Sequence, residues 1–536
     1  MGAHRIDDGW QTEGVNDRVQ LARINLEMNR RIRDAWMMAG VTMVDPSSTW
    51  IDVDVDLARD VVLMPGVIRQ GATTVGEGAI IGPDTTLMDV EVGPGAEVIR
   101  NFVHMDFSAG IRAAARAAGK RVAVLGDLPG PKIRIGKLEP ESVDLNAGDA
   151  FTLTTKAVTG DATRATTPFT RLPDVVKRGD TLFLNDGIVQ LEVQEVSGAN
   201  VRCRVAVGGE IRSRVGLNLP GIDLGISAFT DEDRRWLRFA AAEGLDAVSQ
   251  SFVESESDLA TVRDAAQAMA YHPLIIAKIE RARALERIDP ILEAADGVMI
   301  ARGDLGVEIP IERIALIQKT IMRKANLLGK PVITATQMLE SMTASRRPTR
   351  AEATDAANAI LDGTDCVMLS GESAIGRYPV EATAMLARIA AATEPALAGY
   401  AVSDLLSAQR REDRARLTDL ISMSVRTTVD RVTPAAVFVP TRSGATARVI
   451  ARFRLPVWIV AVSALEATCQ RLQFTWGVHG VYEPDHPEDW KGYISRWLVG
   501  HGVPGDLAVL TEGPSSRHPE ANHRMEIVDL SAPKGL

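Results

Sequence analysis

The sequence of 536 residues is poor in cysteine and in aromatic residues, and it has no long hydrophobic run. Its 3 cysteines, Cys203, Cys366 and Cys469, lie far apart and form no Cys-x-x-Cys pair, which argues against a disulfide framework and a zinc ribbon. Aromatic residues make up 4% of the chain, which disfavours recognition of bases or sugars mainly by stacking. No signal peptide or membrane-spanning helix is expected, so we predict a cytoplasmic protein.

The charge balance is mildly acidic, with 60 Lys and Arg against 70 Asp and Glu. A net charge of −10 argues against a general binder of nucleic acid or of anionic membranes, although local basic pockets can still hold phosphates. At about 150 residues per domain, the length predicts three or four domains.

The first part of the chain has a pattern of its own. Asp17–Ala39 carries apolar residues at helical spacing. Residues 41–98 then break into short apolar triplets cut by Gly, Asp or Pro, as in Ala79–Gly82 and Val90–Gly93. An interval of about six residues is typical of a left-handed parallel β-helix, here of about three coils. An irregular β-rich segment is the simpler alternative.

Strands alternate with amphipathic helices from about residue 98 onward, which predicts an α/β fold with a parallel sheet. The predicted strands are Val98–Phe107, Arg121–Leu125, Ala247–Phe252, Leu274–Ile279, Gly297–Ala301, Pro331–Thr336 and Cys366–Leu369. This is one strand fewer than the eight of a closed (β/α)8 TIM-type barrel, so an incomplete barrel is expected.

Two further blocks complete the predicted organisation. Lys137–Val215 is rich in Thr and Val with Gly-Asp turns, which predicts a small inserted β-domain over the carboxyl rim of the barrel. A second α/β block after Ala396 contains buried strands such as Ala435–Val439. The expected domains are a helix plus partial β-helix in 1–99, a barrel in 100–136 and 216–390, an inserted lid in 137–215, and a C-terminal α/β domain in 391–536.

Polar groups stand at the ends of four predicted barrel strands, where barrel active sites lie. Lys278 and Glu280 are two residues apart and point to one side of a strand, which suits a metal-bridged anionic substrate or a structural ion pair. Asp304, in a segment with two glycines, could be a second Mg²⁺ carboxylate, although an ordinary turn is the alternative. The hydroxyls of Thr336 and Ser370 could organise water for proton transfer.

Several motifs resemble those of pyruvate kinases, and the resemblance runs from about residue 100 to the C-terminus. The motifs are Ala277–Glu280, Ala301–Gly306, Ala335–Met342, Arg347–Glu352, Met368–Glu372, Asn185–Gly187 and Asn218–Gly221. The resemblance implies a glycolytic enzyme that transfers phosphate from phosphoenolpyruvate to ADP with Mg²⁺ or Mn²⁺. It also implies a homotetramer.

The resemblance implies a role for individual residues. Lys278 would neutralise the transferring phosphoryl group, Glu280 and Asp304 would hold the metal, and Thr336 and Ser370 would line a water path for protonation of the enolate. The other implied contacts are with substrate (Ala301, Arg302, Gly303, Asp304, Thr336 and Ser251), with phosphates (Arg134), and with nucleotide (Asp186 and His104).

Two further sites follow from the same resemblance. The monovalent-cation region would comprise Asp106, Ser108, Asp127, Leu128 and Lys132. Lys132 stands where K⁺-dependent members carry Glu, and Leu128 stands where they carry a Thr ligand, so we predict that K⁺ is not required. An effector phosphate loop would comprise Thr441, Arg442, Ser443, Gly444 and Thr446, although a plain strand–helix turn is the alternative.

Residues 3–99 are similar instead to the middle of the bifunctional N-acetylglucosamine-1-phosphate uridyltransferase/glucosamine-1-phosphate acetyltransferase. Gln11–Ala22, Ala39–Pro46 and Gly82–Leu87 carry this resemblance. The nucleotide loop and the acetyl-transfer coils are not in the sequence, so neither sugar-nucleotide activity is expected. The resemblance to pyruvate kinases also implies that the first barrel strand is missing, and His104 and Ala109 depart from the pyruvate kinase pattern. The alternatives to an active kinase are therefore an impaired fusion whose β-helix serves assembly, and a lyase on a related barrel.

Overall fold

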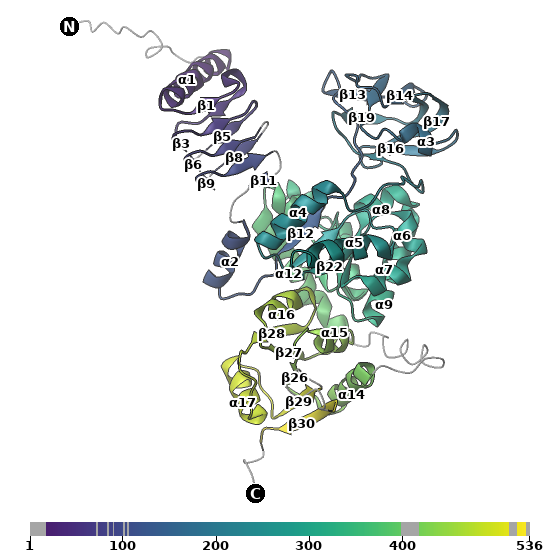
Figure 1. Cartoon of the computed structure of the whole chain (residues 1–536). Coiled ribbons are helices and arrows are strands. Elements are labelled where there is room, and N and C mark those ends of the chain that lie inside the picture. The colour runs from purple at the N-terminus through teal and green to yellow at the C-terminus, as the bar shows by residue number, and fades with distance from the viewer. Residues whose placement is uncertain are drawn as a thin grey trace, which may run out of the picture. The chain divides into compact units, whose positions relative to one another are not determined.

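The computed structural model describes residues 18–70, 73–82, 85–88, 90–99, 102–103, 107–397, 417–513 and 522–531. The chain divides into two compact units, of which the first ends at Gly119 and the second begins at Lys120 (Figure 1).

The first unit is a helix, α1 (Arg18–Met38), followed by a parallel β-helix with three sheets. The first sheet contains β1 (Thr42–Met43), β4 (Val62–Leu63), β7 (Ile80–Ile81), β10 (Glu97–Ile99) and β11 (Phe102–Val103). The second contains β2 (Trp50–Ile51), β5 (Ile68–Gln70) and β8 (Thr86–Met88), and the third contains β3 (Asp56–Leu57), β6 (Thr74–Val75) and β9 (Glu91–Val92). The hexapeptide spacing thus corresponds to one strand per six residues.

The register shows how the coils stack. Trp50 pairs with Ile68, and Ile68 pairs with Thr86, so one coil spans 18 residues. Aliphatic side chains from each coil, such as Ile51 and Ile81, are completely buried between the sheets. Gly76 is required by close stacking, because a Cβ there would lie 2.4 Å from the backbone nitrogen of Pro94 in the next coil.

The prediction of a barrel strand at Val98–Phe107 is wrong. Glu97–Ile99 is β10, which continues the β-helix by pairing in parallel with β7, and Phe107–Ala117 forms the helix α2. The β7 edge offers a ready partner for the apolar residues of β10, and the alanine-rich sequence of α2 favours a helix. Within the described residues, the barrel sheet therefore has six strands.

These six barrel strands are parallel and neighbour one another in chain order. They are β12 (Leu125–Leu128), β21 (Ala247–Gln250), β22 (Leu274–Ile279), β23 (Gly297–Ala301), β24 (Val332–Ala335) and β25 (Cys366–Val367). The helices that follow these strands include α4 (Asp231–Ala242), α5 (Glu256–Gln267), α7 (Ile288–Ala294), α9 (Ile314–Leu327), α10 (Arg350–Leu361) and α12 (Pro379–Thr393). The strand predicted at Arg121–Leu125 is shifted, because β12 begins at Leu125.

The lid is inserted between β12 and α4 and has a hydrophobic core of its own. A six-stranded sheet contains β14 (Ala150–Thr154), β15 (Arg164–Thr166), β16 (Thr181–Leu184), β17 (Val189–Ser197), β18 (Asn200–Val207) and β20 (Leu217–Asn218). The strands β13 (Ser142–Leu145) and β19 (Gly209–Arg212) pair separately, and α3 (Leu172–Val175) is the lid's short helix. The alternation of buried and exposed residues along β17 and β18 explains the Thr- and Val-rich pattern.

The C-terminal domain is a five-stranded sheet in the order β28, β27, β26, β29 and β30. Its elements are α14 (Leu417–Val432), β26 (Ala436–Pro440), α15 (Ala445–Ala451), β27 (Trp458–Ser463), α16 (Glu466–Arg471), β28 (Val478–Tyr482), α17 (Trp490–Gly500), β29 (Leu507–Glu512) and β30 (Arg524–Asp529). A buried ion pair, with Arg454 Nη1 2.9 Å from Asp365 Oδ1, joins this domain to the barrel.

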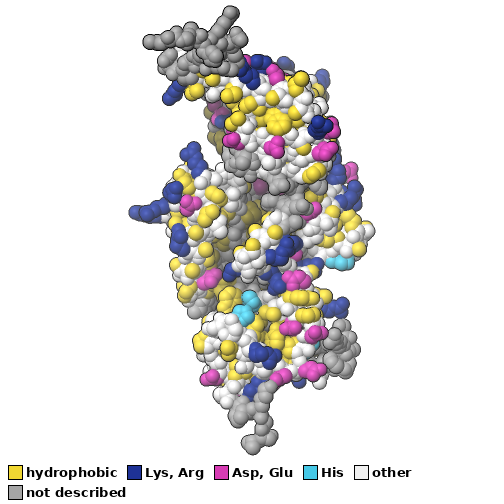
Figure 2. Space-filling view, turned by 90° about the vertical axis from the view of Figure 1, so that its left-hand side faces the viewer, with side chains coloured by type: hydrophobic (Ala, Val, Ile, Leu, Met, Phe, Trp, Pro, Cys, Tyr) yellow, Lys and Arg dark blue, Asp and Glu magenta, His cyan; other side chains and the backbone are white. Residues whose placement is uncertain are grey.

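The surface carries both signs of charge. On the face shown in Figure 2, basic and acidic side chains are interspersed. Among the described residues, no helix is both long and apolar enough to cross a membrane.

The three cysteines give a pH-dependent prediction. Burial raises the pKa of the Cys203 and Cys366 thiols to about 12 and that of the Cys469 thiol to about 11. Because the thiolate is the reactive form, we expect no rapid reaction with Ellman's reagent in the native protein at pH 8 or pH 9. All three thiols should react after unfolding in guanidinium chloride. A rapid equivalent in the native protein would contradict the prediction.

Candidate active site

The ends of three neighbouring barrel strands meet at the ammonium group of Lys278. Lys278 lies on β22, and its Nζ is 2.9 Å from Asp127 Oδ2 at the end of β12. The same Nζ is 2.8 Å from Ser251 Oγ, just beyond β21, and 2.9 Å from Glu280 Oε1, just beyond β22. The Lys278 side chain is 13% exposed, so the cation is largely enclosed by these oxygens. The predicted pairing of Lys278 with Glu280 is thus present, with Asp127 added.

The surroundings of Lys278 keep it charged. Burial alone would lower the pKa of the ammonium group, but the charges and hydrogen bonds of Glu280 and Asp127 outweigh burial and raise this pKa above its usual range. The site therefore offers a fixed positive charge at neutral pH.

Glu280 is a buried carboxylate held from two sides. It is 2% exposed, and its Oε2 accepts a hydrogen bond of 2.9 Å from the backbone N–H of Phe252. Burial raises the pKa of Glu280, the opposite charge of Lys278 lowers it, and the nearby charge of Asp304 raises it further. A divalent cation between Glu280 and Asp304 would relieve both the burial cost and the repulsion.

The helix α8 (Arg302–Glu308) begins directly after β23 and brings Asp304 to the rim. The Arg302 side chain points away, since its guanidinium donates to Asp355 Oδ1 at 2.8 Å and to the Thr336 carbonyl at 2.8 Å. Arg302 therefore offers only its backbone to a ligand. The Gly303 N–H donates to Thr336 Oγ1 at 2.8 Å. Ala301 is buried at the last position of β23.

The two predicted hydroxyls lie at the ends of β24 and β25. Thr336 has a φ of +68°, a left-handed conformation that is uncommon for a β-branched residue, and its hydroxyl donates to the Ala335 carbonyl at 2.6 Å. The Oγ of Ser370 is buried and has no hydrogen-bond partner in the described part of the chain. Its backbone N–H donates to Glu372 Oε2 at 2.7 Å. An unpartnered buried hydroxyl is suited to an ordered water or a ligand.

Lys132 and Asp186 lie at the connection between the barrel and the lid. Lys132 Nζ is 3.9 Å from Asp304 Oδ1. Asp186 is exposed in the turn between β16 and β17. A Cβ on Gly216 would lie 3.7 Å from both Asp186 Oδ1 and Lys132 Cε. The side chains of Asp186 and Lys132 therefore both lie close to Gly216, where the chain returns from the lid to the barrel. Arg134 is also exposed and donates to the Arg214 carbonyl at 3.0 Å.

Four further residues were predicted for the monovalent-cation and nucleotide sites. Leu128 is 1% exposed and belongs to the core at the end of β12. His104 and Asp106 lie outside the described residues, as does the side chain of Ser108.

The predicted effector loop joins β26 to α15 in the C-terminal domain, and its last residue, Thr446, lies in the first turn of α15. Gly444 has a φ of +78° and donates to Thr441 Oγ1 at 3.0 Å. Arg442 and Ser443 are exposed, and Thr446 is half-buried.

Three residues contribute to the site without having been predicted. Ser249 Oγ donates to Asp127 Oδ1 at 2.6 Å, and the Phe252 N–H binds Glu280. Glu372, completely buried, accepts hydrogen bonds from the backbone N–H groups of Leu339 and Ser370. Ser249 and Ser251 show the same two-residue spacing as Lys278 and Glu280, and that signal could have identified Ser249. Phe252 acts through its backbone, so its residue type gives no signal.

The donor set fits a hard divalent cation. In the described residues, no group of three or more His, Cys, Asp or Glu side chains could form a complete protein cage for a metal. Mg²⁺ usually takes one or two protein carboxylates and completes its shell with substrate oxygens and water. Glu280 and Asp304 match that requirement, and Lys278 and Lys132 stand beside them.

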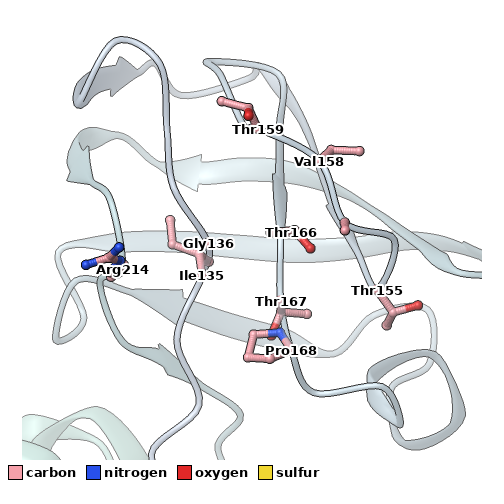
Figure 3. Close-up of a pocket in the computed structure, with 10 residues that line it drawn as sticks. Ile135, Gly136, Thr155, Val158, Thr159, Thr166, Thr167, Pro168 and Arg214 are labelled. Carbon is pink, nitrogen blue, oxygen red and sulfur yellow. The ribbon is translucent and has the colours of Figure 1, made fainter. Parts of the chain in front are cut away.

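A separate hollow lies in the lid (Figure 3). It is lined largely by threonines, together with Ile135, Gly136 and Arg214 from the connecting segments. None of the predicted site residues is among its described lining residues. The chemistry of the barrel rim is therefore the better candidate for an active site.

Comparison with known proteins identifies the family. The family model for the pyruvate kinase barrel domain matches residues 81–383, and that for the pyruvate kinase alpha/beta domain matches residues 419–528. The chain is 46% identical over 406 residues to a pyruvate kinase of Thermococcus litoralis, covering 75% of this chain and 85% of that protein. It is 41% identical to one of Geobacillus stearothermophilus, covering 81% and 76%. The chain belongs to the pyruvate kinase family.

A solved structure supports the same family assignment. A crystal structure of a pyruvate kinase from Cryptosporidium parvum superposes with a TM-score of 0.73 at 33% identity, covering 79% of this chain and 87% of that one. Family membership implies a divalent metal cofactor, which is the kind of ion that the two carboxylates fit.

The enclosed ion pair predicts a stability effect. Lys278→Met should lower the free energy of unfolding by about 3 kcal/mol, because Glu280 would remain buried without its counter-charge. The double variant Lys278→Met/Glu280→Leu should recover part of the loss, since it leaves no unpaired charge. Urea unfolding followed by circular dichroism measures both. A double variant less stable than the single one would contradict this account.

Proposed function

We propose that this chain is an active pyruvate kinase that transfers phosphate from phosphoenolpyruvate to ADP and releases pyruvate and ATP. The observation that carries the proposal is the enclosed Lys278 cation beside the Glu280–Asp304 carboxylate pair. Phosphoryl transfer requires positioning and charge neutralisation above all, and this group of residues supplies both.

Lys278 stabilises the transferring phosphoryl group in this proposal. Its raised pKa keeps the ammonium charged, and its contacts with Asp127, Ser251 and Glu280 fix the direction of the charge. A fixed cation that needs no rearrangement during the reaction stabilises developing charge most effectively.

Glu280 and Asp304 hold the divalent cation, Mg²⁺ or Mn²⁺, which supplies charge neutralisation to the substrate oxygens when bound. The backbone amides of Ala301 to Asp304 bind the substrate carboxylate at the start of α8, with Ser251 alongside. Thr336 and Ser370 order the water that protonates the enolate, a role supported by the unpartnered buried hydroxyl of Ser370.

The lid closes over the nucleotide, with Asp186 facing it and Arg134 reaching the phosphates. Exposed positions of Asp186 and Arg134 beside the lid connections support this part of the proposal. Closure would exclude water from the transferring group. The segment Thr441–Thr446 serves as an effector phosphate loop, supported by the exposed Arg442 and Ser443.

Residues 3–99 derive, in this proposal, from the sugar-nucleotide bifunctional enzyme that they resemble. The three-sheet β-helix supports that origin, although the barrel family model already begins at residue 81, within its coils. Homo-oligomerisation, as a tetramer, and a cytoplasmic location belong to the same proposal. The comparisons do not favour a lyase, and the inserted lid is the feature that a nucleotide substrate explains.

Turnover is the decisive test. Purified protein with phosphoenolpyruvate, ADP and Mg²⁺ should produce pyruvate, measured by coupling to lactate dehydrogenase. Lys278→Ala should reduce kcat by at least about a hundredfold, because removal of one preorganised charge-stabilising group costs roughly that much. The matched control, Lys319→Ala, removes an exposed lysine on α9 and should retain activity. Equal rates in the wild type and Lys278→Ala, or no pyruvate from either, would refute the proposal.

Potassium dependence tests the role of Lys132. The Lys132 ammonium lies 3.9 Å from Asp304 Oδ1 and can supply the positive charge that a bound K⁺ would otherwise provide. We expect kcat to change by less than about twofold when K⁺ is replaced by tetramethylammonium at constant ionic strength. Lys132→Glu should create a K⁺ requirement, seen as activation by added K⁺. Strict dependence of the wild type on K⁺ would exclude this role.

A further inference from the structure

A group of charged residues outside the substrate site holds the segment by which the lid returns to the barrel. The return segment, Leu217–Gly225, begins with β20 of the lid sheet and leads to α4. The group, named here the hinge cluster, consists of Glu254, Arg281, Arg283 and Glu308. None of these residues has a role in the reaction proposed above.

The hinge cluster binds three consecutive residues of the return segment. The backbone N–H of Gly221 donates to Glu308, and Arg281 Nη2 donates to the Ile222 carbonyl at 3.0 Å. Asp223 Oδ2 lies 2.9 Å from Arg283 Nη1. The end of the lid connection is therefore fixed through both its backbone and a side chain.

The centre of the hinge cluster is a buried ion pair. Arg281 Nη1 is 3.1 Å from Glu308 Oε1, and the two side chains are 3% and 2% exposed. Arg281 Nε also lies 3.2 Å from Glu254 Oε1. Burial raises the pKa of Glu308, and Arg281 opposes that rise. A buried pair of this kind is held in one geometry, because loss of either partner leaves an uncompensated charge.

The same elements carry the metal carboxylates. Arg281 directly follows Glu280, and Glu308 lies one helical turn beyond Asp304 on α8. Val307, which directly precedes Glu308, approaches the turn between β16 and β17 of the lid, since a Cβ on Gly187 would lie 3.2 Å from Val307 Cγ2. The helix α8 thus contacts the metal site, the lid turn and the hinge within two turns.

We propose that Arg281 and Glu308 are positioning residues that set the lid hinge and couple occupation of the Glu280–Asp304 site to closure over the nucleotide. This inference rests on the proposed function, because it gives the lid an ADP substrate. Neither residue touches the reacting atoms. Their effect is transmitted through the return segment and α8.

The experiment compares Arg281→Met with Arg287→Met. Arg287 is the matched control because its ion pair with Glu256 is exposed and lies outside the return segment. We expect Arg281→Met to raise the KM for ADP on the order of tenfold and to lower kcat as well, since hinge changes affect both parameters. Arg287→Met should match the wild type.

Two further measurements separate a hinge role from general damage. Amide hydrogen exchange in residues 217–225, with Mg²⁺ and ADP present, should be faster on the order of tenfold in Arg281→Met and unchanged in Arg287→Met. Solvent proton exchange into the methyl group of pyruvate, which needs the barrel rim but no ADP, should stay within about twofold of the wild type. Arg281→Lys should restore part of the ADP affinity.

The outcomes are distinct. If Arg281→Met matches Arg287→Met in KM and amide exchange, or loses proton exchange as severely as kcat, the hinge role is refuted. Glu308→Gln, which keeps an acceptor for Gly221, replaces Arg281→Met if the latter does not fold, and the same criteria apply. If the wild type makes no pyruvate, the proposed function fails, whereas the amide-exchange comparison still decides whether Arg281 holds the return segment.

Discussion

The ammonium group of Lys278 is the constraint on which the active-site rim depends. It joins the ends of β12, β21 and β22 through one cation and three oxygen-bearing side chains. Without it, Glu280 would be a buried carboxylate facing the charge of Asp304, with no opposite charge in contact among the described residues and only the Phe252 N–H to stabilise it. The position of the Glu280 carboxylate therefore follows from where this lysine is held.

The lid contrasts with the rigid parallel sheet beneath it. Its core is separate from the barrel core, and it is joined to the barrel through two connecting segments. Only a few side chains can restrain such a domain, so the residues that hold its connections have a large influence on its position. Arg281 and Glu308 are buried where one of these connections ends. Contacts made by two side chains at this place can control closure of the whole lid.

Local patterns made much of the fold predictable. The six-residue spacing predicted the β-helix, strand–helix alternation predicted the barrel, and the Thr- and Val-rich block with Gly-Asp turns predicted the inserted lid. Rim residues such as Lys278 and Glu280 could be predicted from the sequence, because strand geometry alone places them side by side. The orientation of the Arg302 side chain depends on Asp355, and the hinge role of Arg281 depends on Ile222. Because these partners are far apart in the sequence, no local sequence pattern predicts the contacts. The same reason explains the error at Val98–Phe107, where an earlier coil supplied the competing partner.

The 18-residue coil of the first unit sets a rule for changes in its length. Deletion or insertion of one whole coil leaves every remaining strand facing the same sheet, with its aliphatic residue still inside. A change of six or twelve residues moves each later strand to a different side, and a change that is not a multiple of six also puts buried residues such as Ile81 out of step with the core. Variation in this unit should therefore occur in steps of a coil, whereas the barrel, whose strand ends must converge on one lysine, allows no such modular change.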